Sequence, residues 1–145
     1  MTNHLYNALI APRADSPDPF LIRDGAPSLS FAEFATMAAR MAHVLVANGL
    51  TPGDRVVVQA PKTVEVVALY IATLQAGGVF LPLNTAYTPD EVSYFVGDAT
   101  PRIIICDPAA PISASDATVL TLDADGAGSL TQALADQPPT FDTVP

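Results

Sequence analysis

The string LQAGGVFLPLN at residues 74–84 constrains the fold more than any other part of the sequence. An apolar helix that reaches Gly77 and Gly78 should end there, because glycine tolerates the left-handed conformation that closes helices. The residues Val79–Leu81 then predict a buried strand, and Pro82 lacks the N–H group that would continue its ladder. The chain must therefore turn from a helix directly into a strand, with no linker between them.

The residues before this string complete a strand–helix–strand unit. Val56–Val58 form a fully apolar strand, and Thr63 is a suitable N-cap for the helix that follows. Glu65 lies in the first turn, where a carboxylate is favoured by the positive end of the helix dipole. This helix is apolar nearly all round, which indicates burial on more than one face. Two apolar strands joined by such a crossover are normally parallel and connected with a right-handed turn.

Capping signals mark the other helices. Three pairs match the Ser/Thr-x-x-Glu/Gln pattern of a capping box: Ser30 with Glu33, Thr88 with Glu91, and Ser129 with Gln132. The first of these helices should end at Asn48-Gly49. The second has Pro89 at its first helical position and should end near Gly97. The third should be a short final helix.

Further strands complete an α/β plan. The stretch PFLIRDGAPSLSF predicts a hairpin with arms at 20–22 and 28–30 and a turn at Asp24-Gly25. The apolar runs RIIICD, at 102–107, and TVLTLD, at 118–123, predict two more buried strands. A short helix should precede Pro12. Alternating strands and helices favour a layered α/β fold with a parallel sheet, and with a small hairpin near the N-terminus.

Charge and composition exclude several classes of protein. Six Lys and Arg residues against fifteen Asp and Glu give a net charge of −9, whereas a nucleic-acid-binding surface needs a basic stripe. No apolar run reaches the roughly eighteen residues of a membrane span, and no signal-peptide pattern is present. A single cysteine rules out an internal disulfide and suits a reducing compartment. These features favour a cytoplasmic protein with no nucleic-acid or membrane partner.

No complete active site is visible. Neither a Gly-x-Gly-x-x-Gly nor a Gly-x-x-x-x-Gly-Lys-Ser/Thr motif occurs, and His4 and His43 lack partners at metal-ligand spacing. Cys106 falls in a buried strand, where a thiol acts as a small hydrophobe. Asp107 ends a predicted parallel strand, the edge at which α/β proteins bind ligands. Lys62 could attract an anion at a helix start, although a solvated charge is the simpler interpretation. We therefore assign no catalytic, cofactor-binding or metal-binding residue from the sequence.

Three motifs in order resemble one enzyme superfamily. LSFAEF at 29–34, PGDRVVVQAP at 52–61 and LYIATLQAGGVFLPLNTAYTPDEVSYFV at 69–96 are similar to the opening motifs of the adenylate-forming enzymes. That superfamily includes acyl-CoA synthetases, luciferases and adenylation domains. The form PLNTAYT is most similar to malonyl- and methylmalonyl-CoA synthetases, in which many relatives carry Pro at the place of Thr85. Gln75 stands where Lys is common.

The resemblance implies a scaffold and not a complete enzyme. In such enzymes the opening motifs pack a sheet of the large N-terminal domain. The phosphate loop, the ribose-binding Asp and the catalytic lysine come later. We therefore expect residues 1–145 to be the N-terminal portion of that domain, and residues 137–145, QPPTFDTVP, to be a linker to a remainder. The whole enzyme would use MgATP and coenzyme A to activate malonate or methylmalonate, and the segment alone should be inactive.

Two other interpretations stay open. The chain could belong to another adenylate-forming enzyme, such as a fatty or aryl acid–CoA ligase or an amino-acid adenylation domain. It could also be a complete, non-enzymatic α/β binding module. A complete module should close with a packed element, which the composition of QPPTFDTVP does not predict.

Overall fold

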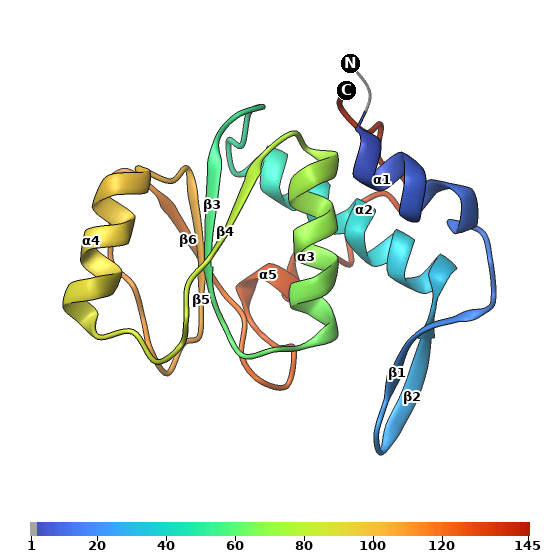
Figure 1. Cartoon of the computed structure of the whole chain (residues 1–145), viewed down its shortest axis with the longest axis horizontal. Helices are drawn as coiled ribbons and strands as arrows, with labels where there is room; N and C mark the ends of the chain where they lie inside the picture. Colours follow the sequence, from blue (N-terminus) through green and yellow to red (C-terminus); the bar gives the residue numbers. More distant parts are fainter. Residues whose placement is uncertain (1–2) are drawn as a thin grey trace.

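A parallel sheet with helices on both faces forms the centre of the protein (Figure 1). The computed structural model describes residues 3–145. The sheet has the order β4-β3-β5-β6, and every neighbouring pair is parallel. Its strands are β3 (Arg55–Gln59), β4 (Val79–Pro82), β5 (Ile103–Cys106) and β6 (Thr118–Thr121). The layered α/β fold expected from the sequence is therefore confirmed. The prediction that β4 and β6 are buried was wrong: both are edge strands, and Val79 and Val119 are exposed.

The helices divide between the two faces of this sheet. One face is covered by α2 (Phe31–Ala47), α3 (Val64–Gln75) and α5 (Ser129–Gln132), and the other by α4 (Pro89–Ala99) (Figure 1). A separate hydrophobic core lies on each face of the sheet. Alternate residues of β3 and β5 pack into one core or the other, because side chains point to opposite faces along a strand. Val56 and Ile103 pack with α2 and α3, whereas Val57 and Ile104 pack with α4; all four are fully buried. The middle residues of the two central strands are thus apolar on both faces of the sheet.

The N-terminal part lies beside the sheet as a separate arm. It consists of α1 (His4–Leu9), a 3-10 turn (Ala11–Arg13) and the antiparallel hairpin of β1 (Pro19–Arg23) and β2 (Ala26–Ser30). The hairpin leads directly into α2 and projects from the body of the molecule (Figure 1). Both the hairpin and the helix before Pro12 agree with the sequence-based expectation.

The glycine pair forms the direct helix-to-strand turn that the sequence requires. Gly77 has a φ of +77°, and its N–H donates to the carbonyl of Leu74 at 3.0 Å. The N–H of Gly78 donates to the carbonyl of Thr73 at 2.8 Å. These two bonds make a Schellman motif, which satisfies the free carbonyls at the end of α3. A Cβ atom on Gly78 would lie only 3.0 Å from Thr73 Cγ2 and 3.1 Å from Leu50 Cδ2, so the close packing also favours glycine.

Two of the three expected capping boxes are present. The Ser30 side chain accepts from the backbone N–H of Glu33 at α2, and Thr88 and Glu91 do the same at α4. The third prediction was wrong, because Ser129 lies inside α5 and Gly128 is the N-cap. The Ser129 hydroxyl instead accepts from the backbone N–H of Thr121 in β6 at 2.9 Å. A tertiary contact with the sheet has replaced the local cap.

Helix α4 also ends later than the sequence predicted. It continues through Gly97 to Ala99, and Thr100 closes it with a φ of +44°. A β-branched residue is strained in this conformation, so something other than local preference must hold the end. The side chain of Arg55 does so, as described below.

Residues 137–145 contain no helix or strand, but they lie against the body of the protein. The Phe141 ring packs edge-on against His43 with centroids 4.9 Å apart, and the carbonyl of Thr140 lies 2.7 Å from His43 Nε2. The N–H of Val144 donates to the carbonyl of Gln75 at 2.9 Å. That these residues lead on to a remainder stays a prediction. Among residues 3–145, no helix has the length and apolar character needed to cross a bilayer.

Gly77→Ala should destabilise the protein by about 1–3 kcal/mol, because alanine is strained at positive φ. The new Cβ would also lie 2.7 Å from Val144 Cγ2. Gly97→Ala is the matched control: Gly97 is helical and its Cβ would meet nothing within 4 Å. That change should stabilise by about 0.5–1 kcal/mol. Urea unfolding of both variants tests the assignment, and equal stability of Gly77→Ala and the parent protein would contradict it.

Candidate functional site

The order of the strands identifies one edge of the sheet as the place for a ligand. Open α/β sheets bind ligands outside the carboxyl ends of their strands, where adjacent connections leave on opposite faces. The connection after β3 enters α3 on the α2 side of the sheet. The connection after β5, residues 107–117, packs Ile112 and Ala114 on the α4 side. The crevice therefore lies between β3 and β5, where Gln59 and Cys106 are paired.

The structure brings two of the sequence candidates to this edge. Asp107 follows β5, and its N–H donates to the carbonyl of Gln59 at 3.2 Å. Its carboxylate already accepts from the N–H of Ala109 at 2.8 Å, so Asp107 holds its own turn. Lys62 precedes α3 and is exposed. Cys106 is 1% exposed within the sheet, which agrees with its interpretation as a small buried hydrophobe.

The histidines lie elsewhere. His4 belongs to α1, and His43 lies on α2 against residues 140 and 141. Within the described residues 3–145, no group of three His, Cys, Asp or Glu side chains could hold a metal ion.

Gln59, which the sequence did not single out, binds the loop after β4 at the carboxyl edge of the sheet. Its side chain is 6% exposed, and its Nε2 donates to the carbonyl of Asn84 at 2.8 Å. Asn84 in turn accepts from the N–H of Ala86 through its side chain at 2.9 Å. Gln59 thereby fixes the loop that carries PLNTAYT against the end of β3. The available signal was one polar residue after the apolar run Val56–Val58, which marks the point where a buried strand reaches a polar environment.

Two hollows flank this hydrogen bond. The first, of about 480 Å³, is lined by Val58, Lys62, Phe80, Leu83, Asn84 and Thr85. The second, of about 410 Å³, is lined by Gln59, Thr85, Tyr87, Val92, Pro111 and Ile112. Thr85 contributes to both, so the loop after β4 forms the wall between them.

The chemistry at this edge is that of binding. The groups lining the first hollow are one ammonium, one amide, one hydroxyl and apolar side chains. Acid–base or nucleophilic catalysis needs a nucleophile and a base within hydrogen-bond reach of each other, and among residues 3–145 the lining of these hollows supplies no such pair. The ammonium, amide and hydroxyl of the first hollow can position a polar or anionic ligand at the carboxyl edge.

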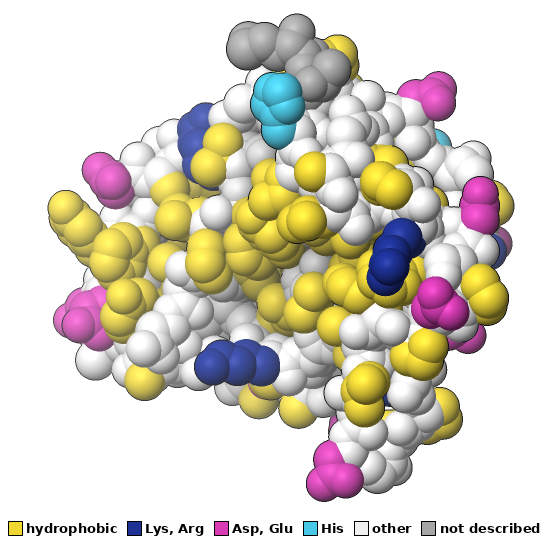
Figure 2. Space-filling view, turned by 45° about the vertical axis from the view of Figure 1, so that its right-hand side comes forward, with side chains coloured by type: hydrophobic (Ala, Val, Ile, Leu, Met, Phe, Trp, Pro, Cys, Tyr) yellow, Lys and Arg dark blue, Asp and Glu magenta, His cyan; other side chains and the backbone are white. Residues whose placement is uncertain are grey.

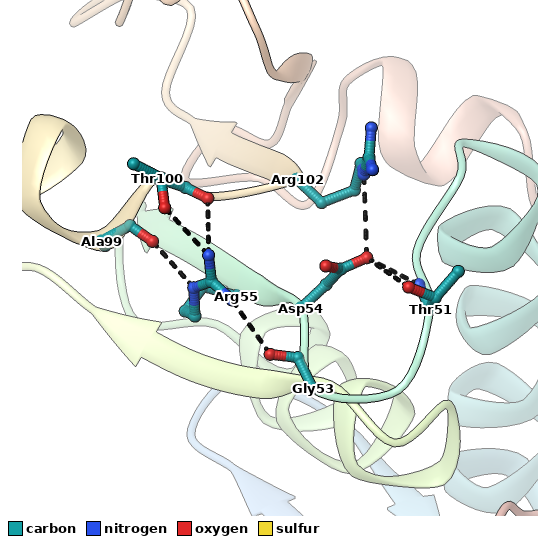
Figure 3. Close-up of polar contacts among 7 residues, drawn as sticks. All are labelled: Thr51, Gly53, Asp54, Arg55, Ala99, Thr100 and Arg102. Carbon is teal, nitrogen blue, oxygen red and sulfur yellow. Dashed lines mark hydrogen bonds and ion pairs between the residues drawn. The ribbon is translucent and has the colours of Figure 1, made fainter.

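At the opposite, amino edge of the sheet, Arg55 binds the end of α4 (Figure 3). Its Nε donates to the carbonyl of Ala99 at 2.7 Å, and its Nη2 donates to both oxygens of Thr100 at 2.9 Å. Its Nη1 reaches the carbonyl of Gly53 at 3.1 Å. The guanidinium thus satisfies free carbonyls at the end of α4 and opposes the negative end of the helix dipole. This contact accounts for the late, strained end of the helix.

A second polar group at this edge centres on Asp54 (Figure 3). Its carboxylate accepts from the N–H of Thr51 at 2.9 Å and from the Thr51 hydroxyl at 2.8 Å, and Arg102 lies 3.7 Å away. The Thr51 N–H bond, followed by the hydroxyl and the nearby arginines, lowers the pKa of Asp54 below its usual value.

A hollow of about 700 Å³ also opens here. We regard it as structural, because the Arg55 donors are bound within the protein and ligands of such sheets bind at the other edge.

Comparisons with known proteins give a consistent picture. A family model described as AMP-binding enzyme matches residues 11–143. The apo structure of MatB from Rhodopseudomonas palustris matches 99% of this chain with 45% identity and a TM-score of 0.92. A fatty acyl CoA synthetase from Mycobacterium tuberculosis matches 78% of the chain with 27% identity and a TM-score of 0.67.

Curated relatives are more varied. Syringomycin synthase SyrB1 of Pseudomonas syringae is 32% identical over 88% of this chain. The long-chain-fatty-acid–CoA ligase FadD13 of Mycobacterium tuberculosis is 32% identical over 76%. The chain spans 20% and 24% of these two relatives, and 30% of the MatB chain. It therefore corresponds to less than a third of the proteins it resembles.

Arg55→Lys should destabilise the protein by about 1 kcal/mol, because an ammonium cannot reproduce the fork of bonds to Ala99, Thr100 and Gly53. Arg102→Lys is the matched control. Arg102 is exposed and makes one long ion pair, so its replacement should change stability by less than about 0.5 kcal/mol. Denaturant unfolding, with amide exchange of α4, measures both effects. Equal effects of the two substitutions would show that Arg55 does not hold the helix end.

Proposed function

The chain belongs to the family of AMP-binding enzymes, and from this premise we propose that it is the N-terminal segment of an acid–CoA ligase that activates malonate or methylmalonate. The observation that carries the proposal is the 45% identity to MatB along 99% of the chain, against 27% for the fatty acyl CoA synthetase. The choice of a small dicarboxylate rests on the form PLNTAYT at residues 82–88. We also propose that this ligase acts in the cytoplasm.

In the proposed reaction a carboxylate oxygen of the acid attacks the α-phosphorus of ATP. An acyl adenylate forms and pyrophosphate leaves. The thiol of coenzyme A then attacks the acyl carbon, and AMP leaves as the thioester forms. Both steps require stabilisation of negative charge on phosphate and carbonyl oxygens.

This chain would contribute the scaffold for that chemistry. Gln59 and Asn84 hold the PLNTAYT loop at the open edge of the sheet, and Lys62 and Thr85 line the hollow beside it. We also propose that the magnesium-binding groups of such a ligase lie in other parts of the polypeptide. We also propose that this segment contains no catalytic residue, because the two hollows at the carboxyl edge are lined by no nucleophile with a base beside it.

The acid itself would require a cation. A second carboxylate must be neutralised when it is buried, since an unpaired buried charge costs several kcal/mol. Four of the five arginines are already engaged within this chain: Arg13 over the Phe31 ring, Arg23 on the carbonyl of Pro27, Arg55 on α4 and Arg102 beside Asp54. Arg40, on α2, lines neither hollow of the carboxyl edge, and Lys62, which lines the first, is exposed to solvent. We propose that an arginine or comparable cation outside this segment binds the second carboxylate.

A second candidate is another adenylate-forming activity. The similarity to FadD13 favours a fatty acid–CoA ligase, and the similarity to the syringomycin synthase SyrB1 leaves an amino-acid adenylation domain as the other alternative. Either would use the same scaffold, because the residues that distinguish acids would lie outside it.

The 145-residue chain alone should neither bind MgATP measurably nor form an acyl adenylate. The reason is that it carries no phosphate-binding loop motif. Calorimetry with MgATP and pyrophosphate exchange with malonate are the measurements, with Rhodopseudomonas palustris MatB as the positive control. Micromolar affinity of the isolated chain for the nucleotide would overturn the scaffold assignment.

The protein encoded by the complete reading frame should release AMP with malonate or methylmalonate at the highest kcat/KM of any acid tested. Acetate, propionate and octanoate should be poorer by about a hundredfold or more, because they leave a buried cation unpaired. A panel of acids assayed with ATP and coenzyme A tests this. A best kcat/KM on octanoate or benzoate would exclude the dicarboxylate and leave the ligase class in place.

A further inference from the structure

The first hollow of the carboxyl edge carries the only lysine of the chain. Lys62 lines this hollow of about 480 Å³ together with two other polar residues, Asn84 and Thr85, and the rest of the lining is apolar. Within residues 3–145, the Lys62 ammonium makes no hydrogen bond and no ion pair. Its charge is therefore available to a ligand.

The other two polar groups of this hollow add hydrogen-bond donors. The Oδ1 atom of Asn84 accepts from the N–H of Ala86 at 2.9 Å, so the side-chain NH₂ is the part that has no partner among the described residues. The backbone carbonyl of Asn84 accepts from Gln59 Nε2 and from the N–H of Tyr87, which holds Asn84 at the end of β3. The Thr85 hydroxyl also has no partner in the part of the chain that the structure describes. The hollow thus gathers an ammonium, an amide NH₂ and a hydroxyl.

Acidic side chains stay away from this hollow. The chain carries fifteen Asp and Glu residues, but among residues 3–145 none of them lines it. Glu65, in the first turn of α3, lies toward the loop between β6 and α5, because a Cβ atom on Gly126 would be 2.5 Å from its Oε1. Figure 2 shows the side of the molecule on which α3 lies: Lys and Arg side chains stand singly among hydrophobic and uncharged ones, and acidic side chains lie toward the margins. In a chain of net charge −9, such a hollow suits an anion.

A phosphate group matches these donors better than a carboxylate does. It presents three acceptor oxygens and nearly two negative charges, so it can bind the ammonium, the amide and the hydroxyl at once. Val66, in the first turn of α3, also lines the hollow, and the positive end of that helix favours the same ligand. Binding should be weak, because Lys62 is exposed and its ammonium is a hydrated point charge on a flexible stem. Weak binding suits a product that leaves and not a substrate that must be oriented.

We propose that Lys62, Asn84 and Thr85 form a site for a phosphate oxyanion, and that its ligand is the pyrophosphate released in the first step of the ligase reaction. The choice of pyrophosphate rests on the proposed function, whereas the site rests on the donors of the hollow. The site would receive the leaving group at the carboxyl edge, where the substrates are proposed to bind.

Amine acetylation can test the site directly, because Lys62 is the only lysine. The 145-residue chain is treated with N-hydroxysulfosuccinimide acetate, and peptide mapping by mass spectrometry measures Lys62 separately from the amino terminus. Pyrophosphate should slow the acetylation of Lys62 by about fivefold or more, whereas sodium chloride of equal ionic strength should have little effect. Malonate and coenzyme A, at the same concentration and ionic strength, should protect less.

Asn84→Asp is the sharpest variant. It keeps the oxygen that accepts from Ala86 and replaces the free donor by a negative charge, so protection by pyrophosphate should be lost. Asn7→Asp is the matched control: it makes the same change at an exposed position of α1 that lines neither hollow, and protection should persist. Because each variant is scored by its own ratio of rates with and without pyrophosphate, a change in the reactivity of the amine cancels.

Equal acetylation of Lys62 with and without pyrophosphate would overturn the site, and so would full protection in Asn84→Asp. Stronger protection by coenzyme A or malonate would overturn the choice of ion. The measurement does not depend on ligase activity. Protection in this chain, when the complete protein forms no thioester, would uphold the site and count against the proposed function. Thioester formation without protection would do the reverse.

Discussion

The burial of β3 between β4 and β5 is the interaction on which the rest of the structure depends. Val56–Val58 are at most 3% exposed, and they pair in parallel with both neighbours. Because both faces of β3 are covered, its side chains join the α2/α3 core to the α4 core. The Schellman turn at Gly77 then sets β4 beside β3 without a linker. Both cores therefore include side chains of this strand.

This arrangement gives the two edges of the sheet different roles. At the amino edge, the hydrogen-bonding groups of Arg55 and Asp54 are used within the protein. Arg55 binds the carboxyl end of α4, and Asp54 binds Thr51 in the loop before β3. At the carboxyl edge, Gln59 fixes one loop and leaves two hollows open. The carboxyl edge is therefore the one at which an α/β scaffold of this strand order binds a ligand.

The features that could be predicted from the sequence are those decided by neighbouring residues. Gly77 and the Ser30 cap depend on local backbone geometry, and both were confirmed. The features that failed depend on distant contacts. Helix α4 passes Gly97 because Arg55, 44 residues away, holds its end. Ser129 is no cap because β6 uses its hydroxyl. For the site, Asp107 indicated the correct edge, but only the strand order identified the crevice and showed that Gln59 organises it.

Amide hydrogen exchange of the 145-residue chain tests the central role of β3 most directly. The amides of Val56–Val58 and Ile103–Ile105 should exchange only through global unfolding, with a free energy equal to that from urea denaturation. The loops at 60–63 and 84–88, on the open edge, should exchange much faster. Exchange of the β3 amides at the rate of those loops would show that the sheet opens locally, and would contradict a fold built on this strand.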